Sequence, residues 1–307
     1  MDGWGSRQGR PMRRGARALL LIAVAACGGS SGSSIPEAPP RAEDDRRAPE
    51  PAQAAVSTPP ASAAPAAPPD KPVIPGALEC VASHYVGTPA AANKGWVLRL
   101  PDASELAWDD GAAKTYEQKI ESPDIEDTLA IPYTTGKIVP ITAVDHDPGR
   151  IRNDALFKAT FGATEQAVRA RLVDVDFVGQ KVKFHERAAA ALGRVSAALT
   201  KLVNAKTSLA PYVKGELGGT FNWRPIVNTN RLSAHSYGIA IDIVTARADY
   251  WEWDKQPDGS FEWNNRIPQA IVDAFEAEGF IWGGRWYHYD TMHFEYRPEL
   301  FDKACTP

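Results

Sequence analysis

Long basic tracts, long apolar runs and internal repeats are absent from this chain of 307 residues. No long basic tract follows the N-terminus, the net charge is −4 and the isoelectric point is about 5.9, so nothing indicates nucleic-acid binding. The apolar run at residues 18–26 is too short to span a bilayer. Apart from its N-terminal region, the chain therefore has the composition of an ordinary globular protein.

Residues 28–75 have almost no aromatic or branched apolar side chains and are rich in Ala, Pro, Ser and Gly. Such a segment cannot bury enough apolar surface to offset the entropy of ordering, so we expect a disordered, proline-extended linker. All tryptophans except Trp4 lie beyond it. The remaining chain is long enough for one well-packed domain. We divide it into an N-terminal extension or subdomain at 76–180 and the motif-bearing part at 181–307.

The N-terminus has the features of a targeting signal. Three arginines precede the apolar run at 18–26. The run ends in Val24-Ala-Ala, directly before Cys27. This pattern resembles a bacterial lipobox and predicts that residues 1–27 are a lipoprotein signal peptide, with lipid on Cys27. An ordinary secretory signal that contains a cysteine is the alternative. Translation from Met12 in place of Met1 would give a more compact basic region.

Cysteine is scarce, with three in the whole chain. If Cys27 carries lipid, Cys80 and Cys305 remain at the two ends of the folded part. An exported protein meets an oxidising compartment, so we expect these two to form a disulfide. Two free thiols are the alternative.

The first half of the folded part reads as short strands and turns. Apolar runs broken by Pro and Gly predict strands at 96–100 and 137–144. Residues 156–161, before Gly162, predict a helix end or a turn. Leucines and valines at three- and four-residue spacing predict a helix over 181–204.

The second half alternates strands with one further helix. Isoleucine at every second position predicts a strand over 239–244. Residues 267–279 predict a helix with Pro in its first turn and Gly just past its end. Residues 286–296 predict a final strand with an interruption near Asp290. With strands bearing the motifs and helices behind them, we expect an α+β fold.

Two polar motifs carry the candidate chemistry: Ser233-Ala-His-Ser-Tyr-Gly-Ile-Ala-Ile-Asp242 and Asp290-Thr-Met-His-Phe-Glu295. Two histidines, an aspartate and a further acid are the inventory of a catalytic zinc site, in which three protein ligands leave one position open for water. We predict Zn²⁺ ligation by His235 from a turn, Asp242 from a strand and His293 from the last strand. Asp242 is hard to explain otherwise, because a buried carboxylate needs a partner.

Two further residues have predicted catalytic roles. Asp290 would lie beside the metal without binding it and would act as base and then as acid. Arg224 would stabilise a developing oxyanion or hold a substrate carboxylate. A turn cap for Asp290, a salt bridge for Arg224 and simple packing for the last strand are the structural alternatives.

The remaining histidines of interest are His185 and His288. His185 lies at the start of a predicted helix, where a surface or packing role is favoured over ligation. His288 is the rival third ligand, but the register of the motif favours His293.

The two motifs, together with the glycine turn and aromatic residue before Arg224, resemble the zinc D-Ala-D-Ala carboxypeptidase family over roughly 180–300. That family includes the vancomycin-resistance dipeptidases and carboxypeptidases and the phage L-alanyl-D-glutamate endolysins. The resemblance implies a Hedgehog/DD-peptidase type of α+β fold. It also implies roles for individual residues: zinc ligands His235, Asp242 and His293, base Asp290 and carbonyl-assisting Arg224.

One departure bears on specificity. The dipeptidases and carboxypeptidases of the family have Glu at the base position, so Asp290 resembles the endopeptidase branch more closely. Glu295 shares the face of His293 if the last strand is regular, and is expected to orient that ligand. Ser233 is expected to hydrogen-bond near the site.

The N-terminal signal and the resemblance together predict an exported, lipid-anchored zinc metallopeptidase of the cell envelope, on the periplasmic side of a membrane. It would hydrolyse peptidoglycan stem-peptide bonds, either as an L-Ala-D-Glu endopeptidase or as a D-Ala-D-Ala carboxypeptidase. Expected partners are peptidoglycan peptides and a membrane through the lipid, with no nucleic acid and a monomeric protein. Alternatives are an inactive cell-wall-binding lipoprotein that keeps the fold, or a structural lipoprotein with incidental motifs. Residues 76–180 fall outside the resemblance and would be a wall-binding or packing module.

Overall fold

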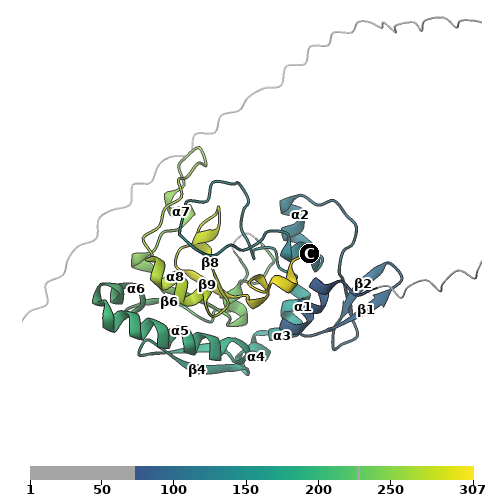
Figure 1. The fold of residues 1–307 in the computed structure, drawn as a ribbon, viewed down its shortest axis with the longest axis horizontal. Coiled ribbons are helices and arrows are strands. Elements are labelled where there is room, and N and C mark those ends of the chain that lie inside the picture. The colour runs from purple at the N-terminus through teal and green to yellow at the C-terminus, as the bar shows by residue number, and fades with distance from the viewer. Residues whose placement is uncertain (1–72, 227–228) are drawn as a thin grey trace, which may run out of the picture. The chain divides into compact units, whose positions relative to one another are not determined.

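A computed structural model describes residues 73–226 and 229–307 (Figure 1). The predicted signal peptide, Cys27 and nearly all of the expected linker lie outside the described residues. Among the described residues, we find no helix with the length and apolar character needed to cross a membrane.

Helices and strands alternate irregularly along the described part. The helices are α1 (Gly76–His84), α2 (Tyr116–Glu121), α3 (Asp154–Phe161), α4 (Glu165–Arg169), α5 (Glu186–Ala205), α6 (Ala210–Val213), α7 (Trp251–Asp254) and α8 (Gln269–Glu276). The strands are β1 (Thr88–Ala92), β2 (Gly95–Arg99), β3 (Glu105–Ala107), β4 (Leu172–Phe177), β5 (Gln180–His185), β6 (Leu217–Gly219), β7 (Ala240–Val244), β8 (Phe280–Trp282) and β9 (His293–Tyr296). They form three antiparallel sheets, with the orders β1-β2-β3, β4-β5 and β6-β7-β9-β8. The predicted α+β class is confirmed.

The four-stranded sheet positions the polar motifs. Its register places Asp242 of β7 directly opposite His293 of β9. Side chains alternate between the two faces of a strand, so Ile241 and Phe294, which are also paired, point to the other face. One face of the β7–β9 pair is therefore apolar and the other carries the candidate ligands.

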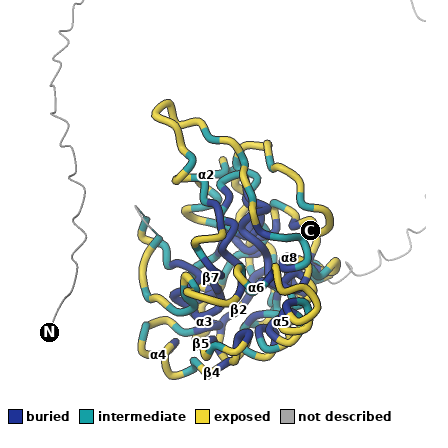
Figure 2. Tube along the Cα trace, turned by 90° about the vertical axis from the view of Figure 1, so that its left-hand side faces the viewer, coloured by how far each residue is buried: buried dark blue, intermediate teal, exposed yellow. Residues whose placement is uncertain are grey.

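Helices α5 and α8 pack together and cover the apolar side of the sheet (Figure 1). Phe275 of α8 stacks on Phe294 of β9, with ring centroids 3.8 Å apart and planes 15° apart. Leu192, Val195 and Leu199 of α5 are fully buried, as their helical spacing predicts, and Leu202 at the end of the helix is half-buried. Figure 2 shows β7 within the buried interior. These helices fix the sheet and leave its polar face open to the site.

The N-terminal part belongs to the same core. Buried side chains of α1 and α3 join those of α5 and β7 in one apolar cluster. Helix α1 also packs against the C-terminal turn at Lys303–Cys305, and a disulfide links Cys80 to Cys305. The domain boundary expected at residue 180 falls inside the β4–β5 hairpin, where every residue of one strand pairs with the other.

Several predicted elements are confirmed by the structure. The strand at 96–100 is β2, the strand at 239–244 is β7, and residues 156–161 form the last part of α3. The helix predicted at 267–279 is α8, which is followed by Gly279 in the left-handed region at φ +79°.

Three predicted elements are wrong in part or in whole. Residues 181–185 form β5 and the helix begins at Glu186, because this stretch alternates polar and apolar side chains and pairs with β4. Residues 137–144 form no strand: most are exposed, and Pro140 has no N–H to donate to a neighbour. The final strand starts only at His293, because the preceding chain turns and the N–H of Asp290 donates to Gly283 O.

Candidate active site

The three predicted metal ligands converge at one point. His235 Nε2 lies 3.1 Å from Asp242 Oδ1 and 3.2 Å from His293 Nδ1. His293 Nδ1 lies 3.0 Å from the same carboxylate oxygen. Ligand atoms on a tetrahedral zinc ion, each about 2.0–2.1 Å from the metal, are roughly 3.3 Å apart. The spacing of this triad matches such a site.

Local sequence explains how His235 reaches the sheet. It lies in a 3₁₀ turn at Ala234–Tyr237, and the Ser233 hydroxyl caps that turn by accepting the His235 N–H. Gly238 ends the turn at φ +67°, a conformation that favours glycine. On the other side, a Cβ on Gly218 of β6 would lie 2.6 Å from the Asp242 Cβ, so only glycine lets β6 approach this ligand. Ser233 thus orients the turn and does not belong to the ligand triad.

Hydrogen-bond acceptors outside the triad determine which ring nitrogen of each histidine faces the centre, the point where the three ligand atoms converge. His235 Nδ1 lies 2.9 Å from the carbonyl of Thr220, which can only accept, so its proton sits there and Nε2 is left with a lone pair. His293 Nε2 faces Glu295 Oε2 at 3.5 Å, which leaves Nδ1 for the centre. Two lone pairs and a carboxylate oxygen this close need a cation between them. The donor set therefore fits a metal ion such as zinc.

The electrostatics of the triad agree with this interpretation. Burial raises the pKa of Asp242, but both histidines lower it more, so the net pKa lies below its ordinary value. Burial lowers the pKa of His293, but Asp242 and Glu295 raise it to about 10. In metal-free protein, a proton thus occupies the centre, and a metal ion binding there must displace that proton.

Asp290 lies in the same cavity but outside the triad. Burial and the negative charge of Asp242 raise its pKa to about 6. Its Oδ1 is buried, with no hydrogen-bond partner among the described residues. A carboxylate left free in this way can accept a proton from a bound water, whereas a residue that merely caps a turn would have its oxygen satisfied.

Glu295 has a larger role than the sequence indicates. Its side chain is 1 % exposed and lies 3.0 Å from Arg152 and 3.3 Å from Arg297. Burial raises its pKa, but Arg152, His293 and Arg297 lower it more, so it is ionised. A buried carboxylate held by two arginines thus supports His293.

Arg224 is exposed and lines the cavity. Its backbone pairs with the segment that carries the turn: Ser233 N donates to Arg224 O at 3.1 Å, and Arg224 N donates to Ser236 Oγ at 3.0 Å. The guanidinium makes no ion pair with any described acid, so the alternative of a structural salt bridge is not seen. It is free to meet a substrate.

The other two histidines are not part of the triad. His288 Nδ1 is 2.7 Å from Asp147 Oδ2 and lines the cavity apart from the ligands. His185 caps α5 and its ring contacts Phe161, so it has the packing role that the sequence favours. Its burial lowers its pKa to about 4. Neither residue replaces His293.

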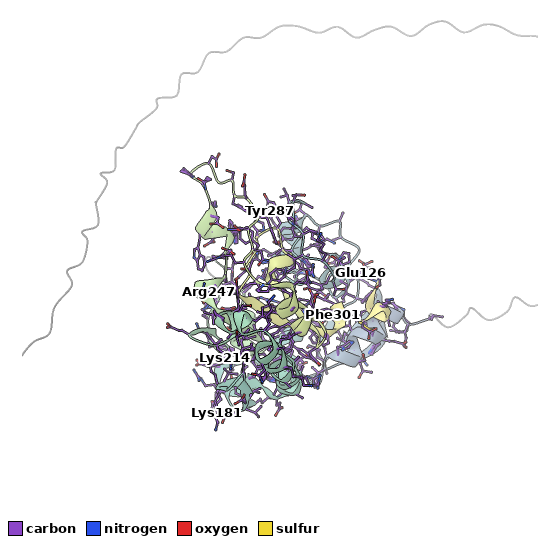
Figure 3. The ribbon with its side chains drawn as sticks, turned by 60° about the vertical axis from the view of Figure 1, so that its left-hand side comes forward. Glu126, Lys181, Lys214, Arg247, Tyr287 and Phe301 are labelled. Carbon is purple, nitrogen blue, oxygen red and sulfur yellow. A yellow bond between two sulfur atoms is a disulfide. The ribbon has the colours of Figure 1, made fainter. Side chains whose placement is uncertain are left out.

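A cavity of about 610 Å³ opens onto these groups, and residues before position 153 form one wall of it. This side of the cavity comes from the segment at 76–180, which the sequence predicts to be a cell-wall-binding or packing module. The segment contributes four polar side chains to the cavity: Tyr116, Asp147, Arg150 and Arg152. The segment also meets the motif-bearing part through a backbone hydrogen bond, in which the N–H of Tyr287, labelled in Figure 3, donates to His146 O at 3.0 Å. No spacing pattern in the sequence announces these residues, because they lie far from the motifs along the chain.

A second group of potential ligands, Cys80, His84, Asp302 and Cys305, lies in the structure at the end of α1. Its two sulfur atoms are bonded to each other, and His84 pairs with Asp302 at 3.1 Å. Disulfide sulfur is not a thiolate ligand, so the centre at His235 is the better metal site.

Comparison with known proteins agrees with the site. A search of curated proteins gives no match. Residues 227–296 match the family model described as D-alanyl-D-alanine carboxypeptidase, and this range includes the three triad residues, Asp290 and Glu295. Arg224 and the cavity wall before residue 153 lie outside the match. The resemblance seen in the motifs is confirmed: residues 227–296 carry the signature of the D-alanyl-D-alanine carboxypeptidase family.

Proposed function

We propose that the protein is a zinc-dependent peptidase that hydrolyses peptide bonds in peptidoglycan stem peptides. The observation that supports it most is the convergence of two imidazole nitrogens and a carboxylate oxygen within 3.2 Å, beside Asp290, whose buried Oδ1 has no partner among the described residues. The family match supports a peptidase, and the donor set supports zinc.

A zinc ion at the triad would act as a Lewis acid on water and on the scissile carbonyl. Asp290 would take the proton from the attacking water and deliver it to the leaving amine. Arg224 would donate hydrogen bonds to the carbonyl oxygen as negative charge develops there. Glu295, held by its two arginines, would keep the ring of His293 in one orientation.

The proposal extends to location and architecture. Export, lipid on Cys27 and a spacer over 28–75 would let a membrane-held enzyme reach the cell wall. The Hedgehog/DD-peptidase type of fold is the arrangement that the resemblance implies. Within stem peptides, Asp290 favours L-Ala-D-Glu endopeptidase action, and the family description favours removal of a terminal D-Ala.

Digestion of purified muropeptides tests the proposal. Zinc-loaded protein is incubated with them, and products are identified by mass spectrometry beside a chelated sample and the Asp290→Asn variant. We expect cleavage in the first sample alone, with loss of D-Ala marking a carboxypeptidase and release of the stem from L-Ala an endopeptidase. Zinc-loaded protein that cleaves no muropeptide would contradict the proposal and favour an inactive binding protein.

A further inference from the structure

Four arginines line the active-site cavity, and the acidic side chains of the cavity do not pair with all of them. Arg150, Arg152, Arg224 and Arg231 all line it. Arg152 is paired with Glu295, but Arg224 and Arg231 have no carboxylate at ion-pair distance in the described part of the chain. Arg224 is exposed, but the guanidinium of Arg231 is partly removed from water without an anion, which is unfavourable and favours an anionic ligand.

Arg231 is half-buried and is the more enclosed of the two arginines that lack an ion pair among the described residues. One nitrogen donates to the carbonyl of Arg150 at 2.8 Å, while Nε is buried with no partner in the part of the chain that the structure describes. Burial and the charge of Arg152 lower its pKa to about 10, so it remains charged at neutral pH. Its position is fixed because Ile226 N donates to Arg231 O at 2.8 Å, within the same pairing that holds Arg224.

Arg150 lies next to Arg231, since its backbone carbonyl accepts from the Arg231 guanidinium. Its guanidinium lies over the ring of Trp286, 5.1 Å from the centroid, which holds it in the cavity. Its nearest acid is Asp147 at 3.5 Å, but that carboxylate already binds His288 at 2.7 Å and the Tyr116 hydroxyl at 2.9 Å. Arg150 therefore keeps donors free for another acceptor.

The other acids of the cavity are accounted for. Asp242 belongs to the triad, Glu295 is paired with Arg152, and Glu252 is exposed on α7. Asp290 serves as the proposed base. None of them lies at ion-pair distance from Arg231, and Arg150 shares Asp147 with His288 and Tyr116, so both guanidinium groups can still bind an anionic ligand.

We propose that Arg150 and Arg231 form a subsite that binds a carboxylate group of the peptide substrate next to the scissile bond. The inference rests on the proposed function and specifies its substrate class: a peptide with a free carboxylate within reach of the metal centre. Planar guanidinium groups bind carboxylates through paired hydrogen bonds, which gives both affinity and orientation. The segment before residue 153 thereby becomes a determinant of specificity.

The carboxylate can come from two sources in a stem peptide, the C-terminus or an internal acidic residue. Three synthetic stem pentapeptides ending in D-Ala-D-Ala separate them: one with all carboxylates free, one with a C-terminal carboxamide and one with the internal carboxylate amidated. Binding is measured by calorimetry on zinc-loaded Asp290→Asn protein, so that affinity is obtained without turnover.

We expect the free peptide to bind about tenfold or more tightly than one of the two amides, as for a hydrogen-bonded charged group. In the same Asp290→Asn background, Arg150→Gln should remove that preference, and Arg150→Lys should keep part of it. Arg231→Gln should have the same effect as Arg150→Gln. Arg99→Gln is the matched control, because Arg99 is a half-exposed arginine of β2 outside the cavity. Thermal unfolding of each variant checks that it is folded.

Equal binding of all three peptides, or a preference that survives Arg150→Gln, would overturn the subsite. Absence of any peptide binding would overturn it as well. If the free peptide is preferred through Arg150 but wild-type protein cleaves none of the three, the subsite stands and the peptidase proposal fails. The two proposals thus fail in different ways.

Discussion

The Glu295→Gln substitution tests whether the buried carboxylate of Glu295 stabilises the protein and supports the metal ligand His293. In the native protein Arg152 has Glu295 as its sole carboxylate partner among the described residues, whereas Arg297 also has Glu299 at 2.6 Å. Removing one member of a buried ion pair costs about 3–5 kcal/mol, because a charge is left without a partner. We therefore expect a loss of this size in the free energy of unfolding of metal-free Glu295→Gln.

The same change weakens the acceptor behind His293. Loss of such an outer partner lowers metal affinity by about 10- to 100-fold, which corresponds to about 1.4–2.7 kcal/mol of binding free energy. Urea denaturation of metal-free protein measures the first effect. Zinc titration in competition with a chromophoric chelator measures the second.

Glu299→Gln is the matched control. Glu299 is 2 % exposed and pairs with Arg297, but it does not contact His293. It should lose less stability, because Arg297 keeps Glu295 at 3.3 Å, and it should keep its zinc affinity. Equal zinc affinities for the two variants would refute the claim that Glu295 orients His293.

Three further predictions follow from the site and the core. Asp290→Asn should keep its zinc, measured by elemental analysis, while kcat falls by about 10²- to 10⁴-fold; retained turnover would remove Asp290 as base. Replacing Cys80 and Cys305 by Ser should lower the free energy of unfolding in urea by about 2–5 kcal/mol and leave zinc content unchanged, and undiminished stability would contradict a structural disulfide. In chelated protein the pKa of His293 is raised from 6.5 to about 10, so its stabilisation is complete below pH 6.5 and lost as pH rises towards 10. The unfolding temperature should fall over that range, and a rise would show that the histidine is not paired as described.

The ligand triad was predictable because its signals are local. Alternating isoleucines identify β7 and place Asp242 on its polar face, and a glycine after the His235 motif marks the turn. The pairing of Asp242 with His293 then follows from the neighbouring strands β7 and β9. Glu295 was predicted for the same reason, since it lies two residues further along β9.

The cavity wall and the start of α5 could not be predicted in this way. Arg150 meets Trp286 through tertiary packing of segments far apart in sequence, and no periodicity marks such a contact. Residues 181–185 have few apolar side chains, and their strand depends on pairing with β4, which outweighs the helical pattern that begins next to it. Acids and arginines that pair inside a core, as Arg152 and Glu295 do, look in the sequence like ordinary surface residues.

X-ray absorption spectroscopy at the zinc edge, on protein loaded with one equivalent of zinc, tests the metal centre most directly. We expect two imidazole nitrogens and one carboxylate oxygen at about 2.0–2.1 Å, with the imidazole signal reduced in His235→Ala and His293→Ala. Failure to retain zinc, or sulfur ligands at about 2.3 Å, would contradict a centre built on His235, Asp242 and His293.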